Sequence, residues 1–137
     1  MRLFVTSDSS KESGVGEVVY EIGGATFEHF HNRNYGPDLN RIAVILMCRN
    51  PAMKFKRRIR FARKDKILYM DVMLSPEEMC ALSRDSRKKI IAERLAEEIP
   101  AVVRKYKLPG FNLERFADDL KGFLADWPKL KVRGAIL

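Results

Sequence analysis

The sequence predicts an α+β fold, a single domain in which a small antiparallel or mixed sheet of about four strands is covered by helices. The length of 137 residues suits one compact domain. The amino-terminal half contains short apolar or alternating runs typical of strands, whereas the carboxyl-terminal half is mostly helical, because its apolar residues recur at helical spacing. We expect one domain over residues 1–128 and a frayed tail over residues 129–137.

The first strand is expected at residues 2–6, followed by a loop over residues 7–16. Two structures fit residues 15–31. Their apolar side chains recur at helical spacing and predict an amphipathic helix. The pair Gly23-Gly24 opposes a helix, at a cost of about 1 kcal/mol per glycine, and suits the turn of a hairpin. The spacing favours the helix, with the hairpin as the alternative.

Three further strands follow a turn-rich segment at residues 32–40. Residues 42–48 form an uninterrupted apolar run, which predicts a strand buried on both faces. In residues 55–61 apolar side chains alternate with basic ones, and in residues 68–74 aliphatic side chains alternate with Tyr69, Asp71 and Met73. Half-buried strands show this alternation. Because the connection between them is too short for a parallel crossover, we expect an antiparallel hairpin.

Helices account for the rest of the chain. Residues 75–78 (SPEE) form a capping box with proline at the first helical position, so a short helix begins there. A longer helix is expected from Ser83 to Tyr106, and Pro100 should kink or split it. The last helix opens at residues 111–112 and ends at Trp127.

The composition is that of an ordinary globular protein. With 46% hydrophobic and 32% charged residues the chain is too apolar for disorder, and it lacks the apolar run that a membrane span requires. Its amino terminus lacks the pattern of a signal peptide, so we expect a cytoplasmic location. Cys48 and Cys80 are expected to be small buried thiols without a disulfide.

Signatures of catalysis are scarce. The chain has no Walker loop, CxxC pair or GxSxG elbow, and residues 14–16 (GVG) lack the third glycine of a dinucleotide fingerprint. His29 and His31 would point in different directions on a helix. The carboxylate pairs at residues 97–98 and 118–119 predict solvated helix faces. We therefore expect no catalytic residue, no metal site and no cofactor.

The net charge of +8 is concentrated in residues 54–66, which we call the basic strip. The strip has eight basic residues against Asp65 alone and so carries +7 of that charge. On an alternating strand, basic side chains would form a row at a spacing of about 7 Å, which suits phosphates or carboxylates. Alternatively, the charges protect an edge strand from aggregation. The candidate partner-binding residues are Lys54, Lys56, Arg58, Arg60, Arg63, Lys64 and Lys66.

The order of these segments carries a family resemblance. Tyr35-Gly36 precedes the buried strand, the basic strip forms a charged strand and turn, and residues 111–120 read FNLERFADDL. This succession resembles the immunity protein 44 family of bacterial polymorphic toxin systems, from about Arg2 to Leu124. The resemblance implies a cytoplasmic, non-enzymatic protector that binds a toxin domain and blocks it, with no catalytic residues to carry over.

Three functions remain open from the sequence. An immunity protein would bind its toxin through the basic strip and apolar anchors, and its charge predicts an acidic or neutral toxin face, or occlusion away from a basic active site. A small nucleic-acid-binding protein would use the same strip on phosphates, although Phe55 and Phe61 are expected to point inward and not to stack on bases. An enzyme would need a site assembled from residues distant in sequence.

Overall fold

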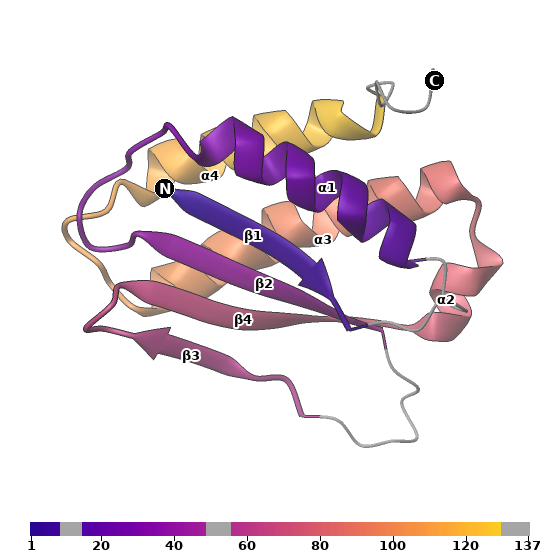
Figure 1. The fold of residues 1–137 in the computed structure, drawn as a ribbon, viewed down its shortest axis with the longest axis horizontal. Helices are drawn as coiled ribbons and strands as arrows, with labels where there is room; N and C mark the ends of the chain where they lie inside the picture. Colours follow the sequence, from indigo (N-terminus) through magenta and orange to yellow (C-terminus); the bar gives the residue numbers. More distant parts are fainter. Residues whose placement is uncertain (9–14, 49–55, 130–137) are drawn as a thin grey trace.

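The structure, a computed structural model, describes residues 1–8, 15–48 and 56–129. These residues form one α+β fold in which a mixed sheet is covered by helices, as predicted (Figure 1). The strands and helices are β1 (Arg2–Ser7), α1 (Val15–Phe30), β2 (Arg41–Cys48), β3 (Ile59–Ala62), β4 (Ile67–Leu74), α2 (Pro76–Ala81), α3 (Arg84–Lys105) and α4 (Leu113–Asp126), followed by a short 3-10 helix (Trp127–Lys129). The predicted tail at 129–137 lies outside the described residues except for Lys129.

The four strands lie in the order β1-β2-β4-β3. Strands β1, β2 and β4 are parallel, and β3 pairs with β4 in the antiparallel direction, which confirms the predicted hairpin. Helix α1 supplies the crossover that two parallel neighbours such as β1 and β2 require. This order leaves β1 and β3 at the two edges of the sheet.

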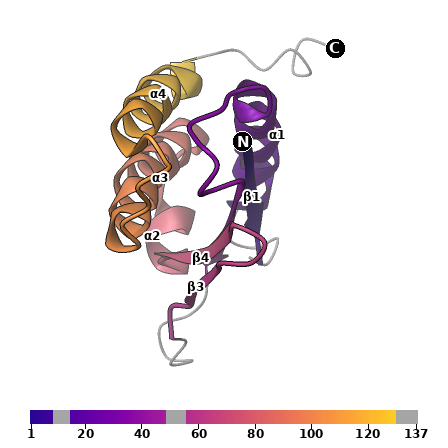
Figure 2. The ribbon, with the colours of Figure 1, turned by 90° about the vertical axis from the view of Figure 1, so that its left-hand side faces the viewer.

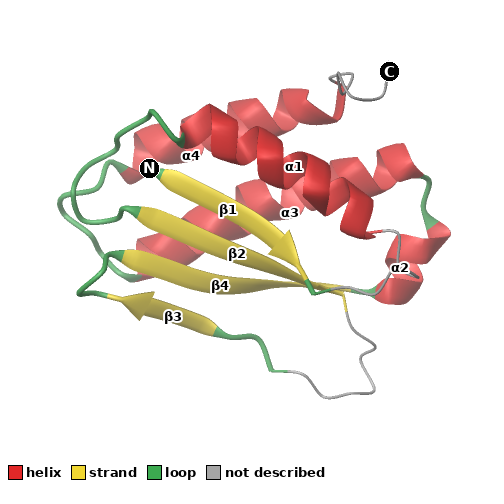
Figure 3. Ribbon diagram, viewed as in Figure 1, coloured by secondary structure: helices red, strands yellow, loops and turns green. Residues whose placement is uncertain are grey.

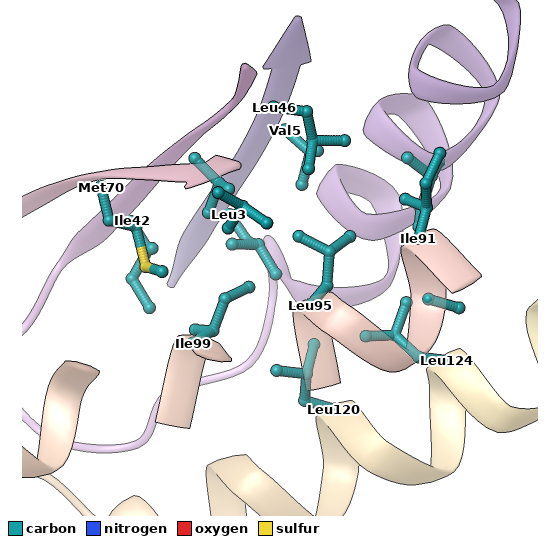
Figure 4. Close-up of a cluster of buried hydrophobic side chains, with 14 of the residues drawn as sticks. Leu3, Val5, Ile42, Leu46, Met70, Ile91, Leu95, Ile99, Leu120 and Leu124 are labelled. Atoms are coloured by element: carbon teal, nitrogen blue, oxygen red, sulfur yellow. The ribbon is translucent and has the colours of Figure 1, made fainter. Parts of the chain in front are cut away.

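The helices lie on one side of the sheet (Figure 2). Leu3 and Ile42 point from the strands toward Leu95 of α3, and α3 in turn packs against Leu120 of α4 (Figure 4). Helix α3 therefore lies between the sheet and α4, and its apolar side chains are buried by both neighbours. This arrangement leaves the other face of the sheet without a helix in the part of the chain that the structure describes (Figure 2).

The prediction that β2 is buried on both faces is correct only at the carboxyl-terminal end of the strand. Ile42, Val44 and Leu46 are buried toward the helices, and Met47 on the opposite face is also buried, but Ala43 and Ile45 on that face are only half-buried. The apolar run follows from the central position of β2, which has β1 and β4 as neighbours. It does not follow from a second helical layer, because the helices that the structure describes lie on one face of the sheet.

Residues 15–30 form a helix, not the alternative hairpin. Val15, Val18, Val19 and Ile22 are buried, as the spacing predicts. Gly23 has a packing role that explains its place in the helix. A Cβ atom there would lie 2.6 Å from the main-chain oxygen of Val5 in β1, so the helix can approach the strand this closely only with glycine.

The two adjacent glycines of α1 give a matched pair of substitutions. We expect Gly23→Ala to lower the free energy of unfolding by about 1–3 kcal/mol, because α1 must move away from Val5. Gly24→Ala meets no atom within 4 Å and should raise it by about 0.5–1 kcal/mol through helix propensity. Urea unfolding of both variants measures the difference, and equal effects would contradict this account.

The helix boundaries follow the predicted caps. The Ser75 hydroxyl accepts a hydrogen bond from the Glu78 main-chain N–H at 3.4 Å, and Ser83 and Asn112 cap α3 and α4 in the same way. Pro100 does not split α3, which is one helix from Arg84 to Lys105. Pro100 itself is buried within this helix, which continues although a proline removes one main-chain hydrogen bond.

Two distant connections are joined at one end of the molecule (Figure 3). The N–H of Asn112 donates to the main-chain oxygen of Tyr35 at 2.6 Å, and the N–H of Gly110 donates to the Asp38 carboxylate at 2.7 Å. The Tyr35 hydroxyl also donates to Asp119 at 2.6 Å. We call this junction of residues 35–38 with residues 110–119 the loop lock. It joins Tyr35-Gly36 to the FNLERFADDL segment, two of the segments on which the family resemblance was drawn.

The remaining predictions concern the cysteines and the membrane. Cys48 is buried as expected, but Cys80 is exposed, because Met79 is the residue that α2 buries. Within the described residues, none of the helices has the length and apolar character needed to cross a bilayer.

Candidate functional site

The basic strip runs along the β3 edge of the sheet and into the turn before β4 (Figure 1). Lys54 lies outside the described residues, as does Phe55. The other candidate residues of the strip are all exposed: Lys56, Arg58, Arg60, Arg63, Lys64 and Lys66. The strand itself is shorter than predicted and begins at Ile59, so Lys56 and Arg58 precede it and Arg60 alone of the three outward-facing cations expected on this strand lies in β3. An edge position is compatible with both interpretations of the strip, a binding surface and protection from aggregation.

Asp71 of β4 accepts hydrogen bonds from Arg57 and Arg58 of the strip. Its carboxylate is almost completely buried and accepts hydrogen bonds from the main-chain N–H of Arg58 at 3.0 Å and from its Nε at 3.2 Å. The main-chain oxygen of Asp71 accepts from Nε of Arg57 at 2.9 Å. Arg57 then reaches Glu98 of α3 at 3.2 Å. Asp71 therefore fixes two consecutive arginines that extend in different directions.

This geometry allows the contribution of Asp71 to be measured. We expect Asp71→Ala to lower the free energy of unfolding by about 1–3 kcal/mol, because the N–H of Arg58 loses its acceptor. Asp71→Asn keeps an acceptor oxygen, and the lost ion pair is worth little because the Arg58 side chain is 67% exposed. Thermal or urea unfolding should place the asparagine variant close to wild type. A loss equal to that of the alanine variant would show that the ion pair stabilises the fold more than the hydrogen bond does.

Two further arginines of the strip lie over aromatic rings. The Arg60 guanidinium lies 4.8 Å from the ring centre of Tyr69, a residue of the neighbouring strand. The Arg63 guanidinium lies 5.5 Å from the ring centre of Phe61. Phe61 is half-buried and packs on Tyr106, the C-cap residue of α3, as its predicted inward direction requires. Tyr69 was not predicted as an aromatic partner of the basic face.

Strand register shows which residues share the face of Arg60. In one row across the sheet, Phe4, Ala43, Tyr69 and Arg60 are consecutive partners. Side chains two residues apart on a strand share a face. We call this side of the sheet, opposite to the helices, the open face. In the four strands it comprises Arg2, Phe4 and Thr6 of β1, Arg41, Ala43, Ile45 and Met47 of β2, Ile67, Tyr69, Asp71 and Met73 of β4, and Arg60 and Ala62 of β3.

A groove lies on the open face beside the strip. Its volume is about 810 Å³, and it is lined by Ile45, Tyr69, Met70 and Asp71 together with residues 56–60 of the strip. Its wall therefore combines apolar and aromatic side chains with the basic groups of the strip. Sequence reasoning found the basic residues of this site but not Ile45 or Tyr69, because they were assigned only to strands. The interruption of an apolar strand by Asp71 was the signal that a polar contact was needed there.

Both histidines contact aromatic rings. His29 stacks on Phe123 with ring centres 4.4 Å apart, and burial together with the charge of Arg33 lowers the pKa of His29. His31 stacks on Phe27 instead, so the two imidazoles do not converge. Among the described residues, no group of three His, Cys, Asp or Glu side chains is arranged to hold a metal ion.

The predicted solvation of the two carboxylate pairs is correct for one member of each pair. Glu97 and Asp118 are exposed. Glu98 instead binds Arg57 and Arg94, and Asp119 accepts the hydrogen bond from the Tyr35 hydroxyl. Burial of Tyr35 and this hydrogen bond both raise the pKa of the phenol, so the hydroxyl stays protonated and can donate. These carboxylates therefore act in the structure as partners of other side chains.

Comparison with known proteins gives one match. The family model for Immunity protein 44 matches residues 1–126, from the start of the chain to the end of α4. No curated protein and no solved structure matches the chain. The match includes the loop lock, the basic strip and the open face, and it confirms the resemblance drawn from the order of segments. This chain belongs to the immunity protein 44 family.

Proposed function

We propose that this protein is the immunity protein of a bacterial toxin system and that it neutralises its cognate toxin domain by binding and occluding it, without catalysis. The family match over residues 1–126 carries this proposal. The toxin is a protein partner, and the site of action is the cytoplasm of the cell that makes both proteins. No cofactor has a part in this function.

The basic strip is the part of the surface that we assign to partner binding. Its exposed side chains at Arg60, Arg63, Lys64 and Lys66 are more numerous than protection of a four-residue edge strand requires. Arg60 and Arg63 also lie over aromatic rings, which restricts their conformations before a partner binds. Such a preordered set of cations suits a partner with acidic side chains.

Co-expression tests the function directly. Cells that produce the protein encoded by the neighbouring upstream gene should grow when this chain is produced with it, and the two proteins should copurify. An unrelated basic protein of similar size serves as the control and should give no rescue. Absence of both rescue and copurification would remove the immunity function.

A nucleic-acid-binding function is the alternative, and one observation favours it. Tyr69 is 38% exposed beside Arg60, an arrangement that can stack a base next to a phosphate contact. This alternative requires binding to arbitrary DNA or RNA that weakens steeply with salt and falls by a similar factor for Lys56→Ala, Arg58→Ala and Arg60→Ala. Fluorescence anisotropy with a labelled oligonucleotide measures it, and loss of binding at physiological salt would exclude it.

A further inference from the structure

The open face of the sheet is the strongest unassigned feature of the molecule. Strand β2, apolar from Ile42 to Cys48, lies in the sheet with one face under the helices and with no helix over the other face in the described part of the chain. On that other face Met47 at the end of the strand is buried, whereas Ala43 and Ile45 are half-buried and Tyr69 is exposed. An uncovered apolar sheet face costs hydrophobic free energy in the isolated protein, and a binding partner can recover that free energy.

The centre of the open face is apolar. Ala43 lies between Phe4 on one side and Tyr69 on the other. Alanine has the shortest side chain of this row, and the Phe4 ring also packs on Phe27 of α1 with ring centres 5.2 Å apart. Ile45 follows Ala43 on the same face and lines the groove. An apolar side chain of a partner would fit between the rings, as anchors do at the centre of protein interfaces.

Cations flank this centre on both sides. The Arg41 guanidinium lies 5.2 Å from the ring centre of Phe4, and that of Arg60 lies 4.8 Å from the ring centre of Tyr69. Arg2 extends the charge on the side of β1, where it pairs in register with Arg41. Asp71 is the one acidic side chain that the four described strands place on this face, and it is almost completely buried against Arg58. The accessible charge of the face is therefore positive at both flanks.

The charge pattern identifies the chemistry of the occupant. Arg41 and Arg60 lie on β2 and β3, which are separated by β4, so about 10 Å lies between their strands. The apolar centre of the open face separates these two cations, whereas a nucleic-acid backbone presents an unbroken row of phosphates. A protein segment with one apolar side chain between two carboxylates satisfies both parts of the pattern.

The geometry points to the open face as the surface that seats the toxin, through a segment of the toxin that places an apolar anchor over Ala43 between two acidic side chains. The acidic groups pair with Arg41 and Arg60. This inference rests on the proposed function and extends the binding surface from the basic strip across the whole sheet. It also gives the strip a position in the interface, since Arg60 belongs to both.

The experiment compares open-face variants with a control on the helical side. Arg60→Glu reverses one flanking charge, and Ala43→Arg fills and charges the centre. Lys121→Glu makes the same change of two charge units at an exposed position of α4. Calorimetry with the purified toxin domain encoded by the upstream gene measures the dissociation constant, and the co-expression assay measures rescue. Circular dichroism and melting curves check that each variant is folded.

We expect Arg60→Glu to weaken binding at least about 10-fold and Ala43→Arg at least about 100-fold, with Lys121→Glu close to wild type. Wild-type binding and rescue that survive unchanged in both open-face variants would overturn this inference and leave the immunity function intact. An equal loss in Lys121→Glu would overturn it as well. If the wild-type protein neither binds nor rescues, both the function and this inference fail, and salt-sensitive oligonucleotide binding that Arg60→Glu abolishes would assign the face to nucleic acid.

Discussion

Gly36→Ala should lower the free energy of unfolding by at least about 3 kcal/mol, the largest effect that we expect from a single methyl group in this protein. Gly36 has a φ of +124°, which L side chains rarely adopt. An added Cβ would also lie 1.9 Å from the main-chain oxygen of Gly110. Both obstacles involve main chain, so a change of rotamer cannot relieve them.

The loss follows from what the loop lock joins. To accept the methyl group, the two connections must separate, and this breaks the hydrogen bonds from Asn112 to Tyr35 and from Gly110 to Asp38. Those bonds hold the start of α4 against the loop that precedes β2. The expected decrease in the free energy of unfolding is therefore larger than the local backbone strain alone would cause.

Two other glycines provide a graded comparison for urea unfolding. A Cβ at Gly110 meets the Asp38 side chain at 2.7 Å, and because that side chain can move, we expect a smaller loss of about 1–2 kcal/mol. Gly122 in α4 meets nothing within 4 Å, so Gly122→Ala should be neutral or stabilising. A Gly36→Ala variant with the stability of Gly122→Ala would contradict the role of the loop lock. Failure of the Gly36 variant alone to fold would agree with it.

Local chemistry in the sequence was sufficient to predict the elements but not their order in the sheet. The cap at Ser75 and the hairpin of β3 with β4 depend on neighbouring residues, so both were predictable. The position of β4 between β2 and β3 depends on long-range pairing. For that reason the apolar run of β2 predicts burial on both faces, whereas the described helices cover one face and Ala43 and Ile45 on the other stay half-buried.

The candidate site shows the same division between local and long-range information. The alternation of the strip correctly predicted that Phe61 points inward and that Arg60 points outward. The partners of these residues come from other strands. Phe4 reaches the face of Arg60 only through the register of the whole sheet, and no pattern within a single segment contains that register.

Gly23 and Pro100 show how tertiary packing overrides a local rule. Each opposes a helix by propensity, and each lies inside one. At Gly23 the close approach to Val5 requires the missing side chain. At Pro100 the helix continues with the proline buried. The close contact at Gly23 comes from a partner strand that the local sequence does not reveal.

Glu21→Gln should lower the free energy of unfolding by about 3 kcal/mol, because it leaves a buried lysine without its anion. Lys88 of α3 is 6% exposed, and its Nζ lies 3.6 Å from Glu21 Oε2 of α1. Its ammonium also lies 4.8 Å from the ring centre of Trp127, which attracts the charge but does not neutralise it. Burial of a charge becomes costly when its counter-ion is removed.

Removal of the lysine instead of the glutamate should change the free energy of unfolding only slightly. Lys88→Met keeps the length of the side chain and its packing on Trp127, while Glu21 retains an ion pair with Arg84. We expect a change within about 1 kcal/mol, since buried ion pairs are often no more stabilising than apolar groups of the same size. The double variant should recover most of the stability that Glu21→Gln loses, because no unpaired ammonium remains. Urea unfolding at neutral pH measures all three proteins, and a double variant as unstable as Glu21→Gln alone would show that Glu21 acts through Arg84 rather than through the buried lysine.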